Sequence, residues 1–187
     1  MIDIERLYSD RAGKMRKSVI RELLKVTQDP EIISFAGGLP NPKSFPFEDI
    51  EGIIGTVMKE NGKTALQYGT TQGVEILREV IAERSKKDGI DATTEDVIIT
   101  NGSQQALDIV GKMFLNPGDT AIVGLPTYLG GINAFRSYES NLTGIPLDED
   151  GMQVDILEET IKNLLKEDIL PKFIYSVPAF QNPAGVV

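Results

Sequence analysis

Two hydrophobic periodicities alternate along the second half of the chain. Short apolar runs at 97–100, 120–123 and 173–177 are typical of buried strands, whereas the amphipathic stretches 103–114 and 154–166 are typical of helices. Turn residues separate these elements, and no hairpin signature joins two strands. The pattern predicts an α/β fold with a mostly parallel sheet and flanking helices.

The remaining elements complete this alternation. Helices are expected at 3–27, 46–60, 73–87 and from the loop at 126–128 to about residue 137, with a further short strand near 142–145. Ligands of open parallel sheets bind beyond the carboxyl ends of the strands. The loops after Thr100, Val123 and Val177 are therefore the ones to search for chemistry.

Composition narrows the chemistry. The 187 residues include no cysteine and no histidine, and the formal net charge is -9. Disulfides, thiolate metal sites and imidazole catalysis are thereby excluded within this chain. The acidic balance argues against nucleic-acid binding, and no apolar run reaches membrane-spanning length. A cytoplasmic protein with no membrane or nucleic-acid partner is expected.

The three loops carry complementary polar groups. Gly102, Ser103 and Gln104 stand where a helix begins, and a helix N-terminus binds phosphate through free N–H groups. Tyr128 follows a Pro-fixed turn and could stack on a planar ring, and Asn182 is a polar amide between Phe180 and Pro183. Each has a plainer interpretation: an ordinary N-cap, a partly buried tyrosine and an Asn-Pro turn. Together they favour a phosphorylated, planar aromatic cofactor.

These segments resemble the class I, fold type I pyridoxal-phosphate-dependent aminotransferases, in particular the 2-aminoadipate and kynurenine aminotransferase branch. The resemblance extends over nearly the whole chain through six segments in order: SVIRELLK (18–25), ISFAGGLPNP (33–42), LQYG (66–69), TNGSQQALD (100–108), PTY (126–128) and PAFQNPAG (178–185). It implies that residues 1–45 line the substrate pocket and belong partly to the small domain. Residues 46–187 would form the first part of the cofactor-binding large domain, and the remainder of that domain and the C-terminal small domain would be absent.

The resemblance also implies residue roles. Pyridoxal 5'-phosphate would be held at its phosphate by Gly102, Ser103 and Gln104, at its ring by Tyr128 and at its phenolic oxygen by Asn182. Tyr68 would reach the phosphate bound by the other subunit of a homodimer. The substrate would be bound by Ser18, Arg21 and Gly38, although Arg21 also fits a solvated basic helix face, because it lies among other basic residues.

The implied activity is transfer of an amino group between an amino acid and a 2-oxo acid. The Schiff-base lysine of the family is expected downstream of Val187, so we expect this chain alone to be inactive. A carbon–sulfur lyase of the same fold stays an alternative, and so does the aminotransferase-like domain of a pyridoxal-phosphate-responsive transcription regulator. A non-catalytic α/β binding protein is a third interpretation. The preferred amino acid is left open.

Overall fold

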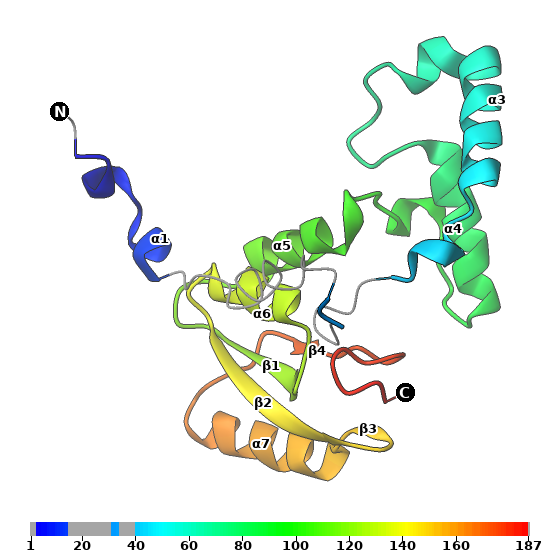
Figure 1. Cartoon of the computed structure of the whole chain (residues 1–187). Helices are drawn as coiled ribbons and strands as arrows, with labels where there is room; N and C mark the ends of the chain where they lie inside the picture. Colours follow the sequence, from blue (N-terminus) through cyan, green and yellow to red (C-terminus); the bar gives the residue numbers. More distant parts are fainter. Residues whose placement is uncertain (1–2, 15–30, 34–39, 187) are drawn as a thin grey trace. The chain divides into compact units, whose positions relative to one another are not determined.

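The computed structural model describes residues 3–14, 31–33 and 40–186 (Figure 1). The chain divides into two compact units. One comprises Leu39–Asn101, and the other comprises Gly102–Val187 together with Met1–Gly38. The α/β architecture expected from the sequence belongs to the second of these units, which also carries most of the predicted site residues.

Four strands form the sheet of this unit. They are β1 (Thr120–Leu125), β2 (Asn141–Asp148), β3 (Gly151–Met152) and β4 (Ile174–Tyr175). The spatial order is β3-β2-β1-β4, and β1 pairs in parallel with both β2 and β4. The central strand β1 is buried from Thr120 to Gly124, as expected for a parallel strand with neighbours on both sides. The parallel α/β prediction is thus confirmed.

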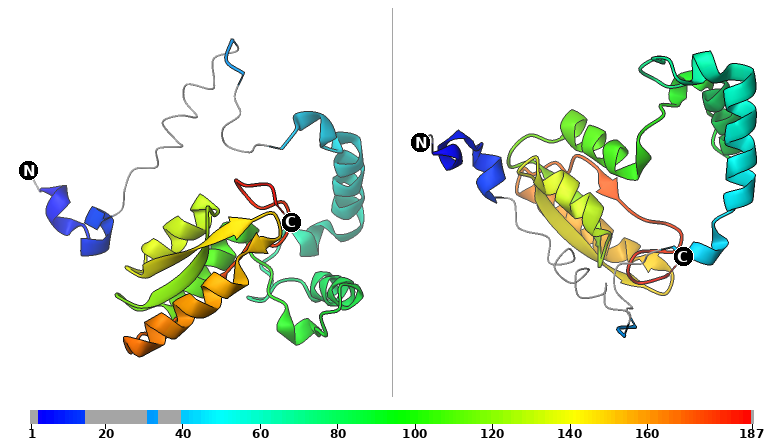
Figure 2. Two further views of the ribbon diagram at one scale, coloured as in Figure 1. Left: turned by 90° about the horizontal axis from the view of Figure 1, so that it is seen from below. Right: turned by 45° about the horizontal axis from the view of Figure 1, so that its top comes forward.

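Helices cover both faces of the sheet (Figure 2). Helices α5 (Gly102–Phe114) and α6 (Leu129–Arg136) lie on one face, and α7 (Val154–Lys166) lies against β2 on the other. Phe135 of α6 is 1% exposed and packs edge-to-face on Phe173 and Tyr175, with ring centroids 5.0 and 5.4 Å apart. This aromatic cluster packs the C-terminal end of α6 against β4 and the residue that precedes it.

The unit Leu39–Asn101 is helical. It contains a short 3-10 helix η2 (Pro42–Ser44), α3 (Phe47–Ala65), α4 (Glu75–Lys87) and a second 3-10 helix η3 (Thr94–Asp96). Arg78 of α4 is 6% exposed, and its Nε donates to the carbonyls of Thr94 and Val97 at 3.0 Å each. A buried guanidinium thus ties α4 to the segment that follows it.

Two sequence predictions about strands are wrong. Residues 97–100 form no strand, and Ile98 is 52% exposed. An apolar run forms a β-strand only when a neighbouring strand lies beside it to accept and donate backbone hydrogen bonds. The backbone of Ile99 bonds instead to the carbonyl of Gln72. The sheet also contains a hairpin, because β2 and β3 pair antiparallel across Glu149 and Asp150.

Helix boundaries differ from expectation at the N-terminal side. The predicted helix 3–27 is interrupted, because η1 (Ile4–Leu7) ends where Tyr8 is extended, and α1 covers only Asp10–Lys14. Its remainder lies outside the described residues. Helix α3 continues beyond residue 60 through a kink at Asn61, whose φ is -132°. Within the described ranges, no helix is long and apolar enough to cross a membrane.

Candidate functional site

The start of α5 meets the start of α6. Gln104 lies in the first turn of α5, and its side-chain Nε2 donates to the carbonyl of Gly130 at 3.3 Å. Gly102 begins the helix with a φ of +73°, a backbone conformation suited to glycine, and a Cβ built there would have no atom within 4 Å. The space where a side chain of residue 102 would lie is therefore open. Ser103 and Gln104 are both exposed there.

Tyr128 lies against the same glycine. It occupies the N-cap position of α6, and its half-buried ring crosses Gly130. A Cβ added to Gly130 would lie 2.3 Å from Cε1 of Tyr128 and 2.8 Å from Oε1 of Gln104. Two predicted site residues from different loops, Tyr128 and Gln104, are thus brought side by side. The absence of a side chain at Gly130 makes this contact possible.

A second tyrosine supports the first, and sequence reasoning missed it. Tyr175 of β4 packs over Gly131, whose added Cβ would lie 2.8 Å from the Tyr175 ring. Burial raises the pKa of Tyr175, and the neighbouring Tyr128 raises it further. The sequence feature that could have indicated this packing is the pair of glycines at 130 and 131, followed later in the chain by an aromatic-rich strand. The sequence alone does not show which ring lies over which glycine.

Asn182 lies in the turn after β4 and is exposed. Among the described residues, none hydrogen-bonds its side chain. The preceding Gln181 is 5% exposed and spans to the other loop, donating from Nε2 to the carbonyl of Pro126 at 2.8 Å. The loops that carry Tyr128 and Asn182 are thereby joined at the carboxyl edge of the sheet.

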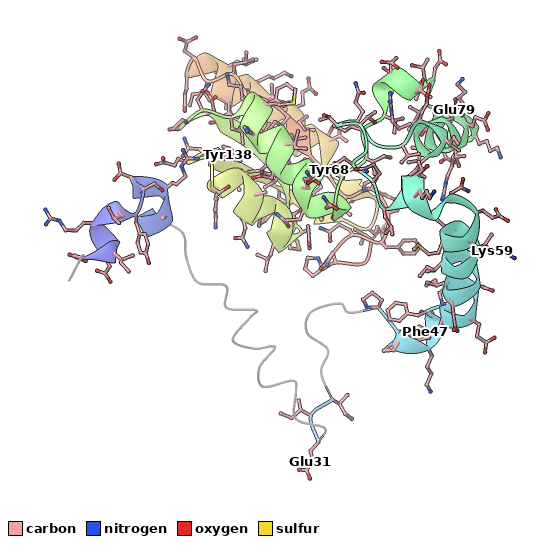
Figure 3. All side chains as sticks on the ribbon, turned by 90° about the horizontal axis from the view of Figure 1, so that it is seen from above. Glu31, Phe47, Lys59, Tyr68, Glu79 and Tyr138 are labelled. Atoms are coloured by element: carbon pink, nitrogen blue, oxygen red, sulfur yellow. The ribbon has the colours of Figure 1, made fainter. Side chains whose placement is uncertain are left out.

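The other predicted site residues belong to the other compact unit or lie outside the described residues. Tyr68, labelled in Figure 3, belongs to the unit Leu39–Asn101, and its side chain is fully exposed. Ser18, Arg21 and Gly38 lie outside the described residues. Their predicted roles stay predictions.

Four lysines fall within residues 102–186, and each is positioned away from this edge. Lys112 follows Gly102 by ten residues of helix, about 15 Å along the axis. Lys172 precedes β4, at the opposite end of the strands, and lies 3.5 Å from Asp119. Lys162 and Lys166 are on α7, beneath the other face of the sheet. Over the part of the chain that the structure describes, no acidic cluster suited to a metal ion is found.

A sequence model of the family Aminotransferase class I and II matches residues 44–187. The chain belongs to this family. An aromatic-amino-acid aminotransferase 1 from Thermococcus litoralis is 48% identical over 99% of the chain. Class I and II aminotransferases of known structure share the fold: kynurenine aminotransferase from Pyrococcus horikoshii, solved in complex with PMP, KYN and KYA, is 50% identical over 99% of the chain, with a TM-score of 0.92.

A second class I and II aminotransferase structure is that of LysN, an α-aminoadipate aminotransferase from Thermus thermophilus. It was solved with N-(5'-phosphopyridoxyl)-L-leucine. The identity is 40% over 100% of the chain, and the TM-score is 0.85. The chain spans slightly less than half of each of these proteins: 45% of the Thermococcus litoralis enzyme, 46% of the Pyrococcus horikoshii chain and 44% of LysN.

Proposed function

We propose that the protein uses pyridoxal 5'-phosphate to transfer an amino group between an amino acid and a 2-oxo acid. The observation that carries this proposal is the convergence of the α5 N-terminus, Gln104 and Tyr128 around Gly130. Membership of the class I and II aminotransferase family supports it, and so do the phosphopyridoxyl ligand of LysN and the PMP of the Pyrococcus horikoshii enzyme.

The residues present fit a phosphorylated pyridine. The first turn of α5 offers the backbone N–H and the hydroxyl of the exposed Ser103, donors that a phosphate accepts, together with the positive end of the helix dipole. Tyr128 presents a half-buried ring held against Gly130, which suits stacking on a flat heterocycle. Asn182 presents an amide without a partner among the described residues, suited to a phenolic oxygen.

When bound, the cofactor supplies an electron sink for the bonds at the substrate Cα. The residues of this chain bind and orient it. Ser103 and the α5 N-terminus fix its phosphate, and Tyr128 restricts its tilt. Asn182 donates a hydrogen bond to the phenolic oxygen, which stabilises the ionised form and lowers its pKa. We further propose a homodimer in which Tyr68 reaches the partner's phosphate, with Ser18, Arg21 and Gly38 at the substrate.

We also propose that these 187 residues do not catalyse transamination by themselves. None of the four lysines between residues 102 and 186 lies at the carboxyl edge of the sheet, which supports this proposal. The cytoplasmic location expected from the sequence stays a prediction.

The test is a binding and turnover experiment with matched variants. Pyridoxamine 5'-phosphate, which needs no lysine, should bind the chain, and Ser103→Ala should weaken its binding. The control Ser137→Ala removes a hydroxyl at the far end of α6, where it donates to Ala134, and should leave binding unchanged.

Turnover is measured separately, on the whole protein. The whole protein should convert pairs of amino acid and 2-oxo acid without releasing ammonia. Ammonia release would indicate the carbon–sulfur lyase alternative. Absence of pyridoxamine phosphate binding would contradict the proposed cofactor.

A further inference from the structure

Gln181 is a buried polar side chain to which the family resemblance assigns no role. It is 5% exposed, and both ends of its amide are bonded. Nε2 donates to the carbonyl of Pro126 at 2.8 Å, and Oε1 accepts from the N–H of Ala184 at 2.7 Å. Its backbone N–H donates to the carbonyl of Val186 at 3.0 Å. A buried amide satisfied in this way is held in a single orientation.

These bonds connect two functional loops. Pro126 precedes Tyr128 by two residues, and Gln181 immediately precedes Asn182. The strands that precede the two loops, β1 and β4, pair through their backbones. Among the described residues, Gln181 is the only one whose side chain donates a hydrogen bond from one loop to the other. The bond between Oε1 and Ala184 also closes the turn that contains Asn182. The amide therefore sets the distance between the Tyr128 backbone and the Asn182 turn.

We propose that Gln181 is a positioning residue for the cofactor ring: it fixes the Asn182 amide relative to the Tyr128 ring. This inference rests on the proposed function. It concerns only the ring end of the site, because the phosphate end is built on α5, which Gln181 does not contact through any hydrogen bond that the described residues show. Loss of the Gln181 bridge should therefore weaken recognition of the ring and spare recognition of phosphate.

Two isosteric changes separate the bridge from simple packing. Gln181→Glu keeps the acceptor for Ala184 but places a carboxylate oxygen against the Pro126 carbonyl, where a donor is needed. Gln181→Met keeps the volume and removes both hydrogen bonds. Truncation to alanine is less informative, because Gln181 borders a cavity of about 180 Å³ that truncation would enlarge.

Asn141 provides a matched control. Its side-chain Nδ2 donates to the carbonyl of Gly118 at 2.9 Å, so it is also an amide that ties a strand segment to a neighbouring loop. It begins β2, at the opposite end of the sheet from Tyr128 and Asn182. Asn141→Asp makes the same chemical change as Gln181→Glu, away from the proposed ring site.

The experiment measures two dissociation constants for each variant of the full chain. Pyridoxamine 5'-phosphate is followed by its fluorescence and inorganic phosphate by phosphorus NMR. We expect Gln181→Glu and Gln181→Met to raise the constant for pyridoxamine phosphate at least tenfold and that for inorganic phosphate less than twofold. Asn141→Asp should change neither. The Met variant carries the test if the Glu variant fails to fold.

A merely structural role would raise both constants together, or would give the same result in Asn141→Asp, and either outcome would overturn the inference. Unchanged pyridoxamine phosphate affinity in both Gln181 variants would also overturn it. Failure of the unaltered chain to bind pyridoxamine phosphate is a different result: it removes the proposed cofactor, and this inference with it.

Discussion

Gly130→Ala tests the packing on which the proposed ring site depends. The added methyl group would lie 2.3 Å from Cε1 and 2.6 Å from Cζ of Tyr128, and 2.8 Å from Oε1 of Gln104. Ordinary contact begins near 3.4 Å, so the tyrosine ring has to retreat by about 1.1 Å. The ring is the part that moves, because the glycine backbone is held within α6.

The cost to binding follows from the loss of stacking. An aligned aromatic pair contributes about 0.5–1.5 kcal/mol beyond its buried area, and about 1.4 kcal/mol corresponds to a tenfold change in affinity. We expect pyridoxamine phosphate to bind about tenfold more weakly to Gly130→Ala. The free energy of unfolding should fall by less than the crowding alone would cost. Crowding costs about 1–3 kcal/mol, and the gain of about 1 kcal/mol in helix propensity offsets part of it.

The assay combines fluorescence titration with thermal unfolding. Gly55→Ala is the control, because Gly55 lies in α3 with no atom within 4 Å of an added Cβ. That control should gain helix propensity without changing affinity. A Gly130→Ala protein that folds and binds pyridoxamine phosphate as tightly as the unaltered chain would refute the placement of the cofactor ring against Tyr128.

Two further predictions concern stability. Arg78→Met removes the charged donor shared by the carbonyls of Thr94 and Val97 and should lower the free energy of unfolding by about 2–3 kcal/mol in urea titrations. Glu95→Gln, which removes a carboxylate 81% exposed, should change it by less than about 0.5 kcal/mol; equal effects would contradict the assigned role of Arg78. The backbone N–H of Asn116 lowers the pKa of Asp119, so this carboxylate stabilises the folded state above its ordinary pKa of 3.8 and loses that effect as pH falls through the lowered value. The stability difference between the unaltered chain and Asp119→Asn should therefore shrink in acid, and a difference independent of pH would contradict this.

Elements that carry their own signals could be predicted from the sequence. The amphipathic pattern of 154–166 coincides with α7, and the apolar run that starts at Thr120 coincides with β1. Residues 97–100 share the composition of β1 yet form no strand, because strand formation depends on a neighbouring backbone that local composition does not encode. The hairpin to β3 was missed because only two residues of β3 pair.

The candidate site shows the same division. Gly102, Ser103 and Gln104 could be placed at the start of a helix, because a glycine followed by polar residues is a local signal for a helix N-terminus. Gln181 could not, since its importance comes from a carbonyl 55 residues earlier in the chain. The packing of Tyr128 on Gly130 likewise depends on the third dimension. The residue types at the ends of helices and strands could be predicted from the sequence. The long-range contacts that orient their side chains could not.

In the proposed site, the α5 N-terminus, Tyr128 and Asn182 hold one phosphorylated pyridine. A crystal structure of the protein with pyridoxamine 5'-phosphate tests this arrangement most directly. Phosphate oxygens should lie at hydrogen-bond distance, about 2.7–3.2 Å, from donors in the first turn of α5. The ring should stack on Tyr128, and the phenolic oxygen should lie at the Asn182 amide. A ligand bound with its phosphate away from Ser103, or with its ring away from Tyr128, would contradict this arrangement.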